Sequence, residues 1–308
     1  MTDRIRGVLA PVLTPFKPNL EPDLPRLIAH CRWLIANQVG LALFGTNSEA
    51  ASLSVDERIH LTDAIIEAGI PAARLMPGTG GCSLTDAVRL TRHAVQSGAS
   101  GALMLPPFFF KGVSDEGLYA YYSEVIEQVG SDRLKVYLYH IPQFTQVPIT
   151  LNLISMLRKR YPDTVVGAKD SSGDWDNTRA MIDNYAKDGF DVFPASESTL
   201  SNALPMGAAG CISATVNMNP QGIHAVYTGW NTVEGPALQE KADGVRKIFQ
   251  KLPMIPAMKR VVAEASQDPE WSIVRPPLVA LDAPMSQNLF RELGAVQFEM
   301  MGYPVKRY

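Results

Sequence analysis

The sequence has few of the residues that crosslink a chain or bind a metal ion. Its 308 residues include three cysteines, Cys31, Cys82 and Cys211, and five histidines. Three widely spaced cysteines make no disulfide framework, which indicates a reducing compartment. The histidines, at positions 30, 60, 93, 140 and 224, have no ligand spacing to one another or to the cysteines. We therefore expect no metal site.

An excess of one charge and long apolar runs are also missing. The 28 basic and 31 acidic residues leave a net charge of −3, and no basic run interleaves with aromatics, so we expect no nucleic-acid partner. The apolar stretches are too short to span a bilayer, and residues 1–6 show no signal-peptide pattern. With 46% hydrophobic and 19% charged residues, the composition predicts a globular, cytoplasmic protein.

Short apolar runs alternate with amphipathic segments through most of the chain. The candidate strands are residues 7–13, 40–45, 74–78, 101–106, 135–140, 165–169, 191–195 and 210–214. Unbroken apolar runs are typical of parallel strands covered on both faces. Eight βα repeats over about 230 residues predict an α/β fold of the (β/α)8 TIM-barrel type. Residues 14–18 contain no glycine-rich loop, which disfavours a doubly wound open sheet.

Helix patterns lie between these runs and continue beyond them. They cover residues 23–37, 54–68, 83–97, 114–129, 150–160, 175–186 and 198–206, and the second opens with a capping-box pattern from Ser54 to Glu57. Residues 232–251, 254–266 and 285–301 read as three further helices with no strands between them. We therefore predict a barrel catalytic domain over residues 1–231 and a C-terminal helical subdomain over residues 232–308.

Lys169 stands at the end of the sixth predicted strand, directly after an apolar run. Lysine is rarely buried without a task. Burial disfavours the charged amine, and a neutral amine attacks a ketone to form a Schiff base. The alternative is a lysine that extends to solvent from the strand end.

Other reactive groups follow other strands, at the end of the barrel where active sites gather. The turn Gly45-Thr46-Asn47-Ser48 offers N–H groups and hydroxyls that can hold an anion, unless it is an ordinary capped turn. Tyr139 can relay a proton if Thr46 lies within hydrogen-bond reach. Because neighbours in a strand alternate, we expect Tyr139 to point into the barrel and His140 toward the helices. Glu49 either bonds loop backbone or touches a ligand.

Four motifs together resemble one known family. They are Gly45-Thr46-Asn47-Ser48-Glu49, Tyr139-His140-Ile141-Pro142, residues 167–174 and Gly210-Cys211-Ile212-Ser213, in that order. The set is similar to the dihydrodipicolinate synthase / N-acetylneuraminate lyase family over nearly the whole chain. The resemblance implies a barrel with a C-terminal helical extension, a class I aldolase or related lyase, and a homotetramer built as a dimer of dimers.

The resemblance also implies roles for individual residues. Lys169 matches the lysine that forms a Schiff base with pyruvate or another 2-keto acid, and Tyr139 matches the proton-relay tyrosine. Thr46 and Asn47 stand at the positions of the family's hydroxyl pair in the turn that holds the keto-acid carboxylate. In that turn Asn47 replaces a threonine and Ser48 replaces a glycine. Ile212 matches the apolar residue near the bound keto acid.

Three positions outside this turn also depart from the family pattern. Phe144 stands where dihydrodipicolinate synthases carry an arginine for the second substrate's carboxylate. Phe109 stands where a tyrosine from a neighbouring subunit completes the proton relay. Glu197 is retained as a candidate substrate ligand, but Ser196 replaces an aspartate, which indicates a substrate with fewer hydroxyls than sialic acid.

These observations predict a metal-independent carbon–carbon lyase that cleaves or condenses pyruvate and an aldehyde through a Schiff base, with no cofactor. The candidate catalytic residues are Lys169, Tyr139 and Thr46. The candidate substrate-binding residues are Asn47, Ser48, Glu197, Ile212 and Phe109. Alternatives are a 4-hydroxy-tetrahydrodipicolinate synthase, a dehydratase of a 2-keto-3-deoxy sugar acid, and a catalytically silent barrel that binds a keto acid.

Overall fold

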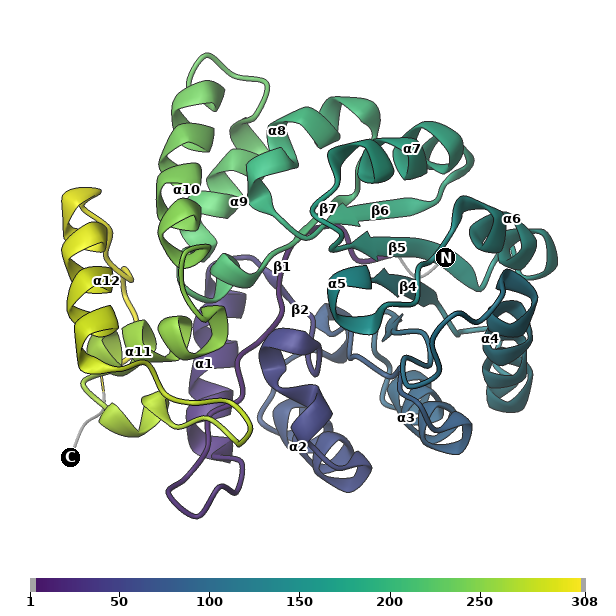
Figure 1. The fold of residues 1–308 in the computed structure, drawn as a ribbon, viewed down its shortest axis with the longest axis horizontal. Coiled ribbons are helices and arrows are strands. Elements are labelled where there is room, and N and C mark those ends of the chain that lie inside the picture. Colours follow the sequence, from purple (N-terminus) through teal and green to yellow (C-terminus); the bar gives the residue numbers. More distant parts are fainter. Residues whose placement is uncertain (1–3, 306–308) are drawn as a thin grey trace.

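The structure, a computed structural model, describes residues 4–305. Parallel strands form a ring, and helices cover it on the outside (Figure 1). Among the described residues the strands are β1 (Gly7–Ala10), β2 (Gly40–Leu41), β3 (Ala102–Met104), β4 (Val136–His140), β5 (Val165–Asp170), β6 (Asp191–Pro194) and β7 (Gly210–Ile212). They pair in the orders β2-β1-β7 and β3-β4-β5-β6. This arrangement confirms the predicted (β/α)8 barrel.

The predicted third strand, residues 74–78, is less regular than expected. Arg74 ends a short 3₁₀ helix, and the following residues make two isolated parallel bridges, Leu41 with Leu75 and Gly78 with Leu103. Pro77 has no N–H to donate, so a continuous ladder cannot form there. The segment still closes the ring between β2 and β3.

Gly210 allows β7 to approach β1 closely. Its φ is 146°, and a Cβ at this position would lie 1.8 Å from the carbonyl oxygen of Gly7. Only glycine fits such an approach. β6 and β7 are linked by a hydrogen bond of 2.9 Å from the N–H of Ala209 to the carbonyl of Val192.

The helices around the barrel follow the predicted segments closely. They are α1 (Leu24–Ala36), α2 (Val55–Glu67), α3 (Leu84–Gln96), α4 (Asp115–Val129), α5 (Pro142–Thr145), α6 (Leu151–Arg160), α7 (Trp175–Tyr185), α8 (Leu200–Ala203) and α9 (Pro220–Gly229). The capping box of Ser54 and Glu57 is present. Two helices, α5 and α9, were not predicted, although Asn219 and Pro220 are a cap and a first-turn proline that mark the start of α9.

Two predicted helices differ in extent from the structure. The segment predicted at residues 198–206 is divided into α8 and two 3₁₀ turns, and Pro205 lies in the second turn, where it removes a backbone donor. The helix predicted at residues 285–301 is α12 (Ala283–Ala295), which begins two residues earlier because Asp282 caps it.

The C-terminal helices pack beside α1 (Figure 1). They are α10 (Gly235–Phe249), α11 (Met254–Ser266) and α12. Leu34 of α1 and Phe249, Met258 and Leu289 of these helices belong to one buried apolar cluster. The domain boundary at residues 231/232 stays a prediction.

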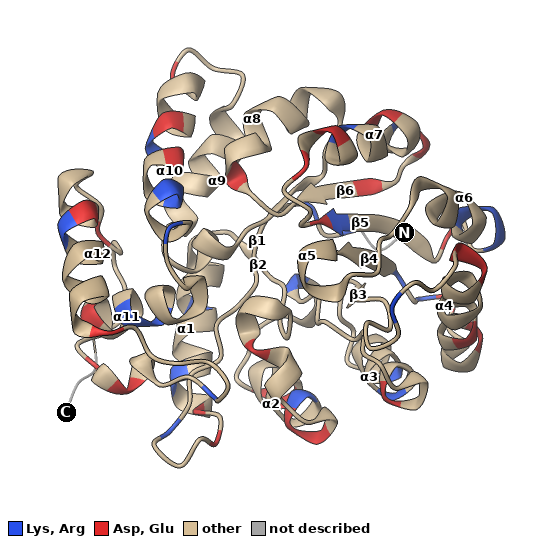
Figure 2. Ribbon diagram, in the orientation of Figure 1, with Lys and Arg blue, Asp and Glu red and all other residues tan. Residues whose placement is uncertain are grey.

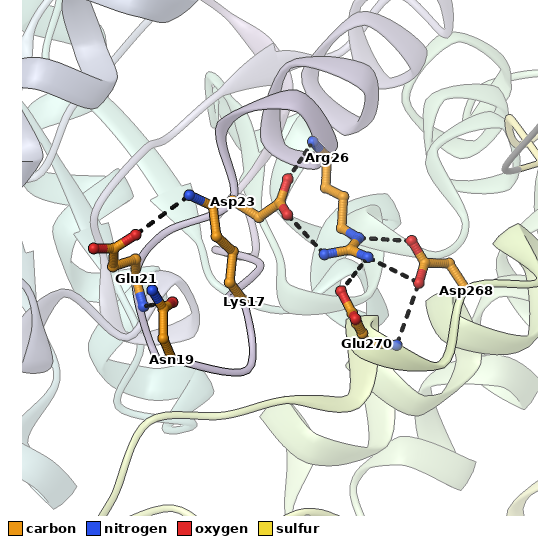
Figure 3. A network of polar contacts seen from close by, with 7 residues as sticks. All are labelled: Lys17, Asn19, Glu21, Asp23, Arg26, Asp268 and Glu270. Carbon is orange, nitrogen blue, oxygen red and sulfur yellow. Dashed lines mark hydrogen bonds and ion pairs between the residues drawn. The ribbon is translucent and has the colours of Figure 1, made fainter. Parts of the chain in front are cut away.

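A polar cluster joins α1 to the chain after α11 (Figure 3). The guanidinium of Arg26 donates to Asp23 at 2.7 Å, to Asp268 at 2.6 and 3.0 Å and to Glu270 at 2.5 Å. The Arg26 side chain is 12% exposed. Buried charges are tolerated when they are paired in this way.

Charged positions lie mostly on the helices and loops outside the barrel, with both signs interspersed (Figure 2). Within residues 4–305, no helix combines the length and apolar character that crossing a membrane requires.

Candidate active site

Lys169 and Tyr139 meet inside the barrel. They are paired in register on β5 and β4. Nζ of Lys169 donates to the Tyr139 hydroxyl at 3.2 Å and lies 4.3 Å from the centre of the tyrosine ring. Each residue is 2% exposed. The alternative of a lysine extending to solvent is therefore wrong, and the expected inward direction of Tyr139 is confirmed.

Thr46 completes a chain of three polar groups. Its hydroxyl oxygen lies 3.1 Å from the Tyr139 hydroxyl. Thr46 begins the 3₁₀ turn Thr46–Ser48, which follows β2. The condition for a proton relay stated from the sequence, hydrogen-bond reach between Tyr139 and Thr46, is met.

The pKa of Tyr139 is set by competing effects. Burial raises it, but the positive charge of Lys169 and hydrogen bonds with Thr46, Lys169 and Ser171 outweigh burial and hold the pKa below its usual value. A phenol with a lowered pKa gives up and takes back a proton more readily near neutral pH. The Ser171 contact was not predicted, although the residue lies two positions after the lysine.

Apolar residues surround this polar chain. Ile212 is fully buried and belongs to the same cluster as Tyr139, Leu9 and Phe193. Phe193 is also the register partner of Lys169 on β6. These apolar surroundings lower the local dielectric constant, which strengthens the electrostatic interactions of the amine and the phenol.

His140 and Asp170, the residues after Tyr139 and Lys169, support the site from outside the barrel. The Nδ1 atom of His140 accepts from the N–H of Ile149 at 2.9 Å. Burial lowers the pKa of His140, against the opposing effect of the Asp170 carboxylate. Asp170 accepts from Thr178 at 2.6 Å and from the N–H of Ser172 at 2.9 Å, which anchors the loop after Lys169. His140 points toward the helices, as expected.

The other predicted turn residues have different surroundings. The Ser48 hydroxyl donates to the carbonyl of Val12, and its own carbonyl accepts from Thr14 at 2.8 Å. Ser48 is 1% exposed, so its side chain secures the turn to the end of β1. Asn47 is half-buried beside Thr46.

Glu197, which follows β6 in the chain, is fully buried. Its carboxylate accepts hydrogen bonds from Ser213 and Thr215 and lies 3.6 Å from Nη1 of Arg246. Arg246 belongs to α10, far along the chain, and no sequence signal pointed to it. The structure thus places the Glu197 carboxylate among three partners of this chain.

Phe109 lies at the surface, away from this buried chain of groups. It is 74% exposed, and its ring contacts Phe110 at 5.5 Å between centroids. Phe144 is 68% exposed. Glu49, left open from the sequence, bonds backbone: it accepts from the N–H of Arg275 at 2.9 Å and pairs with Lys259.

Metal ligands do not gather here. Across residues 4–305, no three His, Cys, Asp or Glu side chains stand close enough together to hold an ion.

Known sequences match nearly the whole chain. The profile of the dihydrodipicolinate synthetase family matches residues 4–296. A protein of Chloroflexus aurantiacus described as an uncharacterized DapA-like lyase is 34% identical over 279 residues, which are 90% of this chain and 92% of that protein. The 4-hydroxy-tetrahydrodipicolinate synthase of Methanococcoides burtonii is 30% identical over 303 residues, 94% of this chain and 99% of the relative.

Solved structures give the same result. Dihydrodipicolinate synthase from Agrobacterium tumefaciens superposes with a TM-score of 0.88 at 30% identity, over 95% of this chain and 99% of that one. YagE from E. coli, solved in complex with pyruvate, has a TM-score of 0.87 at 26% identity, over 96% and 99%. The chain belongs to the dihydrodipicolinate synthetase family, which confirms the predicted class of an aldolase-type lyase acting on a 2-keto acid.

Proposed function

We propose that this protein is a class I lyase that cleaves or condenses pyruvate and an aldehyde through a Schiff base on Lys169. The observation that carries the proposal is the buried chain of groups: the Lys169 amine 3.2 Å from the Tyr139 hydroxyl, and that hydroxyl 3.1 Å from Thr46. A nucleophile, a proton carrier and a group that orients the carrier are the parts that covalent carbonyl chemistry needs.

In the first step Nζ of Lys169 attacks the ketone carbon, C2, of a 2-keto acid. The oxygen of C2 takes one proton from the attacking amine and one from Tyr139 and leaves as water, so that a protonated imine on Lys169 and a phenolate on Tyr139 remain. The carboxylate is held by main-chain N–H groups at the start of the Thr46–Ser48 turn, and Asn47 lies beside it. Ile212 packs against the apolar part of the ligand. Fixing the keto acid at several points orients C2 toward the amine.

In the second step the phenolate of Tyr139 takes the proton of the C4 hydroxyl. The C3–C4 bond breaks, the aldehyde leaves, and the bonding electrons pass into the imine to give an enamine. Protonation of C3 and addition of water then release pyruvate and the free lysine. Condensation is the same sequence reversed. Every step uses groups of this chain and water.

Borohydride trapping tests the proposal. Incubation with pyruvate and borohydride should attach a reduced adduct to Lys169, which peptide mapping by mass spectrometry locates. The variant Lys169→Met should show no adduct, whereas Lys135→Met, just before β4, where the lysine donates to the carbonyl of Asp163, should be trapped like the wild type. An unmodified Lys169 in the wild-type protein would refute the mechanism.

A second candidate function is 4-hydroxy-tetrahydrodipicolinate synthase. Several relatives carry that name, including one at 30% identity over 94% of this chain. Phe144, in place of the arginine expected for a second carboxylate, favours another aldehyde. An assay of pyruvate release over a panel of 4-hydroxy-2-keto acids, together with condensation of pyruvate with aldehydes, separates the two candidates.

The same panel separates the remaining alternatives. A dehydratase of 2-keto-3-deoxy sugar acids would release water and keep the carbon chain whole. A silent keto-acid-binding barrel would form the adduct and turn over no substrate. The presence of both Lys169 and Tyr139 supports turnover.

We also propose that the protein is a cytoplasmic homotetramer, a dimer of dimers. The exposed rings of Phe109 and Phe110 support a contact between copies, because large exposed apolar groups favour association. Phe109 would then reach the site of a neighbouring subunit. Sedimentation of the wild type and of Phe109→Ser tests this, and a monomeric wild type would refute it.

A further inference from the structure

Glu49 connects the catalytic turn to the C-terminal helices. The turn that contains Thr46 lies between Phe44 and Glu49. Neither residue is a glycine, yet both have a positive φ of 55°, in the left-handed region. Such conformations carry strain and persist only where the surroundings hold them. Something outside the turn must therefore fix Glu49.

The fixing contacts come from the C-terminal part of the chain. The Glu49 carboxylate is ion-paired with Lys259 of α11 and accepts from the N–H of Arg275. The two charged side chains are 2% and 0% exposed. Lys259 also donates to the carbonyl of Ile273 at 2.8 Å. A buried pair of this kind holds its partners strongly, since moving either one leaves a charge uncompensated.

Neighbouring contacts stiffen the same region. The Lys259 ammonium lies 4.4 Å and the Arg275 guanidinium 4.7 Å from the centre of the buried Phe16 ring. Arg275 also pairs with Glu57 of α2, the helix that follows the turn. Lys259 thus contacts the turn, and Arg275 contacts both the turn and the helix behind it.

Backbone hydrogen bonds carry this anchoring to the reactive groups. The N–H of Glu49 donates to the carbonyl of Thr46 at 3.1 Å, and the N–H of Ala50 donates to Gly45 at 3.3 Å. A shift of Glu49 therefore displaces Thr46, whose hydroxyl lies 3.1 Å from Tyr139.

We propose that Glu49, held by Lys259, is a positioning residue that sets the Thr46 hydroxyl against Tyr139, so that the C-terminal helices govern the competence of the site. The inference rests on the proposed Schiff-base function. It assigns to the C-terminal helices a task in catalysis besides their packing on α1.

The test is a double-mutant cycle, with trapping of pyruvate at Lys169 and turnover as readouts. Glu49→Gln keeps an oxygen for the Arg275 N–H and removes the charge that Lys259 needs. It should lower turnover about tenfold in the wild-type background and less than about twofold in a Thr46→Val background, because both changes act on the same hydroxyl. Equal losses in the two backgrounds, or none, would overturn the proposal.

The pH profile separates positioning from a general loss of structure. A hydrogen bond with Thr46 helps to hold the pKa of Tyr139 low. Glu49→Gln should therefore shift the limb of the pH–rate profile that reports the titration of Tyr139 to higher pH, and Thr46→Val should shift it in the same direction. An unmoved limb in folded protein would contradict the proposal. If Glu49→Gln does not fold, Lys259→Met provides the same test, because it removes the other partner of the ion pair.

The control is Glu264→Gln, which removes a carboxylate from an exposed pair with Arg260 on the same helix and should leave turnover and pH profile unchanged. Absence of the adduct in the wild-type protein would refute the Schiff-base function itself. An adduct in the wild type with an unmoved profile in the variant refutes only the role of Glu49.

Discussion

Tyr139 and Lys169 occupy paired positions on adjacent parallel strands, and this register places the phenol and the amine 3.2 Å apart. Side chains alternate between the two faces of a strand, so a slip of one residue in either strand would turn one partner toward the helices. The pairing of β4 with β5 is therefore as important to the site as the two residues themselves.

Tyr139→Phe should retain the fold and lose most of the turnover. The change removes one hydroxyl and leaves the packing of the ring, while the loss of a proton carrier costs about 10²- to 10⁴-fold in rate. Steady-state assay of pyruvate release measures it. Tyr137→Phe, two residues earlier on β4, removes a hydroxyl that bonds Asp191 at 3.5 Å and should keep turnover near the wild-type value. Turnover of Tyr139→Phe within threefold of wild type would contradict a relay.

Phe144→Arg should shift the preference toward aldehydes that carry a carboxylate. Guanidinium groups bind carboxylates with two hydrogen bonds, but Phe144 is 68% exposed, so water weakens the gain. We expect an increase of about fivefold in kcat/KM for succinic semialdehyde relative to an uncharged aldehyde. Phe144→Gln controls for the loss of the ring. An unchanged ratio would show that this position does not face the second substrate.

Acid should destabilise the protein through His30. Its Nε2 atom lies 3.0 Å from Oδ1 of Asn217 and its Nδ1 atom 3.1 Å from the hydroxyl of Tyr303. Burial lowers the pKa of His30 to about 4, against a hydrogen bond with Asn217 that raises it. The unfolded chain has the ordinary histidine pKa of 6.5. Between about pH 4 and pH 6.5 the unfolded state therefore binds more protons at His30 than the folded state does. The free energy of unfolding has its full value above about pH 6.5 and falls as the pH drops.

The expected loss from His30 between pH 7 and pH 5 is about 2 kcal/mol of unfolding free energy. Urea unfolding at the two pH values measures it. His30→Gln should show that much less pH dependence than the wild type, and the exposed His60→Gln should show the wild-type dependence. Equal dependence in wild type and His30→Gln would be inconsistent with a neutral, buried imidazole.

Arg26→Gln should destabilise the protein more than any loss of an exposed ion pair. Figure 3 shows both kinds of pair: Arg26 at the centre of three carboxylates, and Lys17 with Glu21 at 3.3 Å on the surface. Loss of the nearly buried guanidinium should cost about 3 kcal/mol. Lys17→Gln, as the control, should cost less than about 0.5 kcal/mol. Urea unfolding gives both values, and similar small losses would show that the Arg26 cluster contributes little.

Local patterns were sufficient to predict most of the fold. Several helix starts could be predicted because a capping side chain accepts a hydrogen bond from an N–H group two or three residues further along the chain. These starts are at Asp23, Ser54, Ser83, Ser114 and Thr150. The segment at residues 74–78 is less regular than the predicted strand. The pattern of apolar residues indicates a strand there, but it carries no information on the backbone N–H that Pro77 lacks. The four-residue helix α5 is too short for a periodic signal.

For the site, the sequence determined which groups stand at strand ends: Lys169, Tyr139 and the turn of Thr46. Period-two alternation also determined that Tyr139 and His140 face opposite sides. Only the tertiary structure decided what each group touches. It placed the Glu197 carboxylate on Ser213, Thr215 and Arg246, and it held Glu49 with Lys259, 210 positions further along the sequence. Such partners meet through the closure of the barrel and the docking of the last helices, and contacts of that range leave no periodic trace in the sequence.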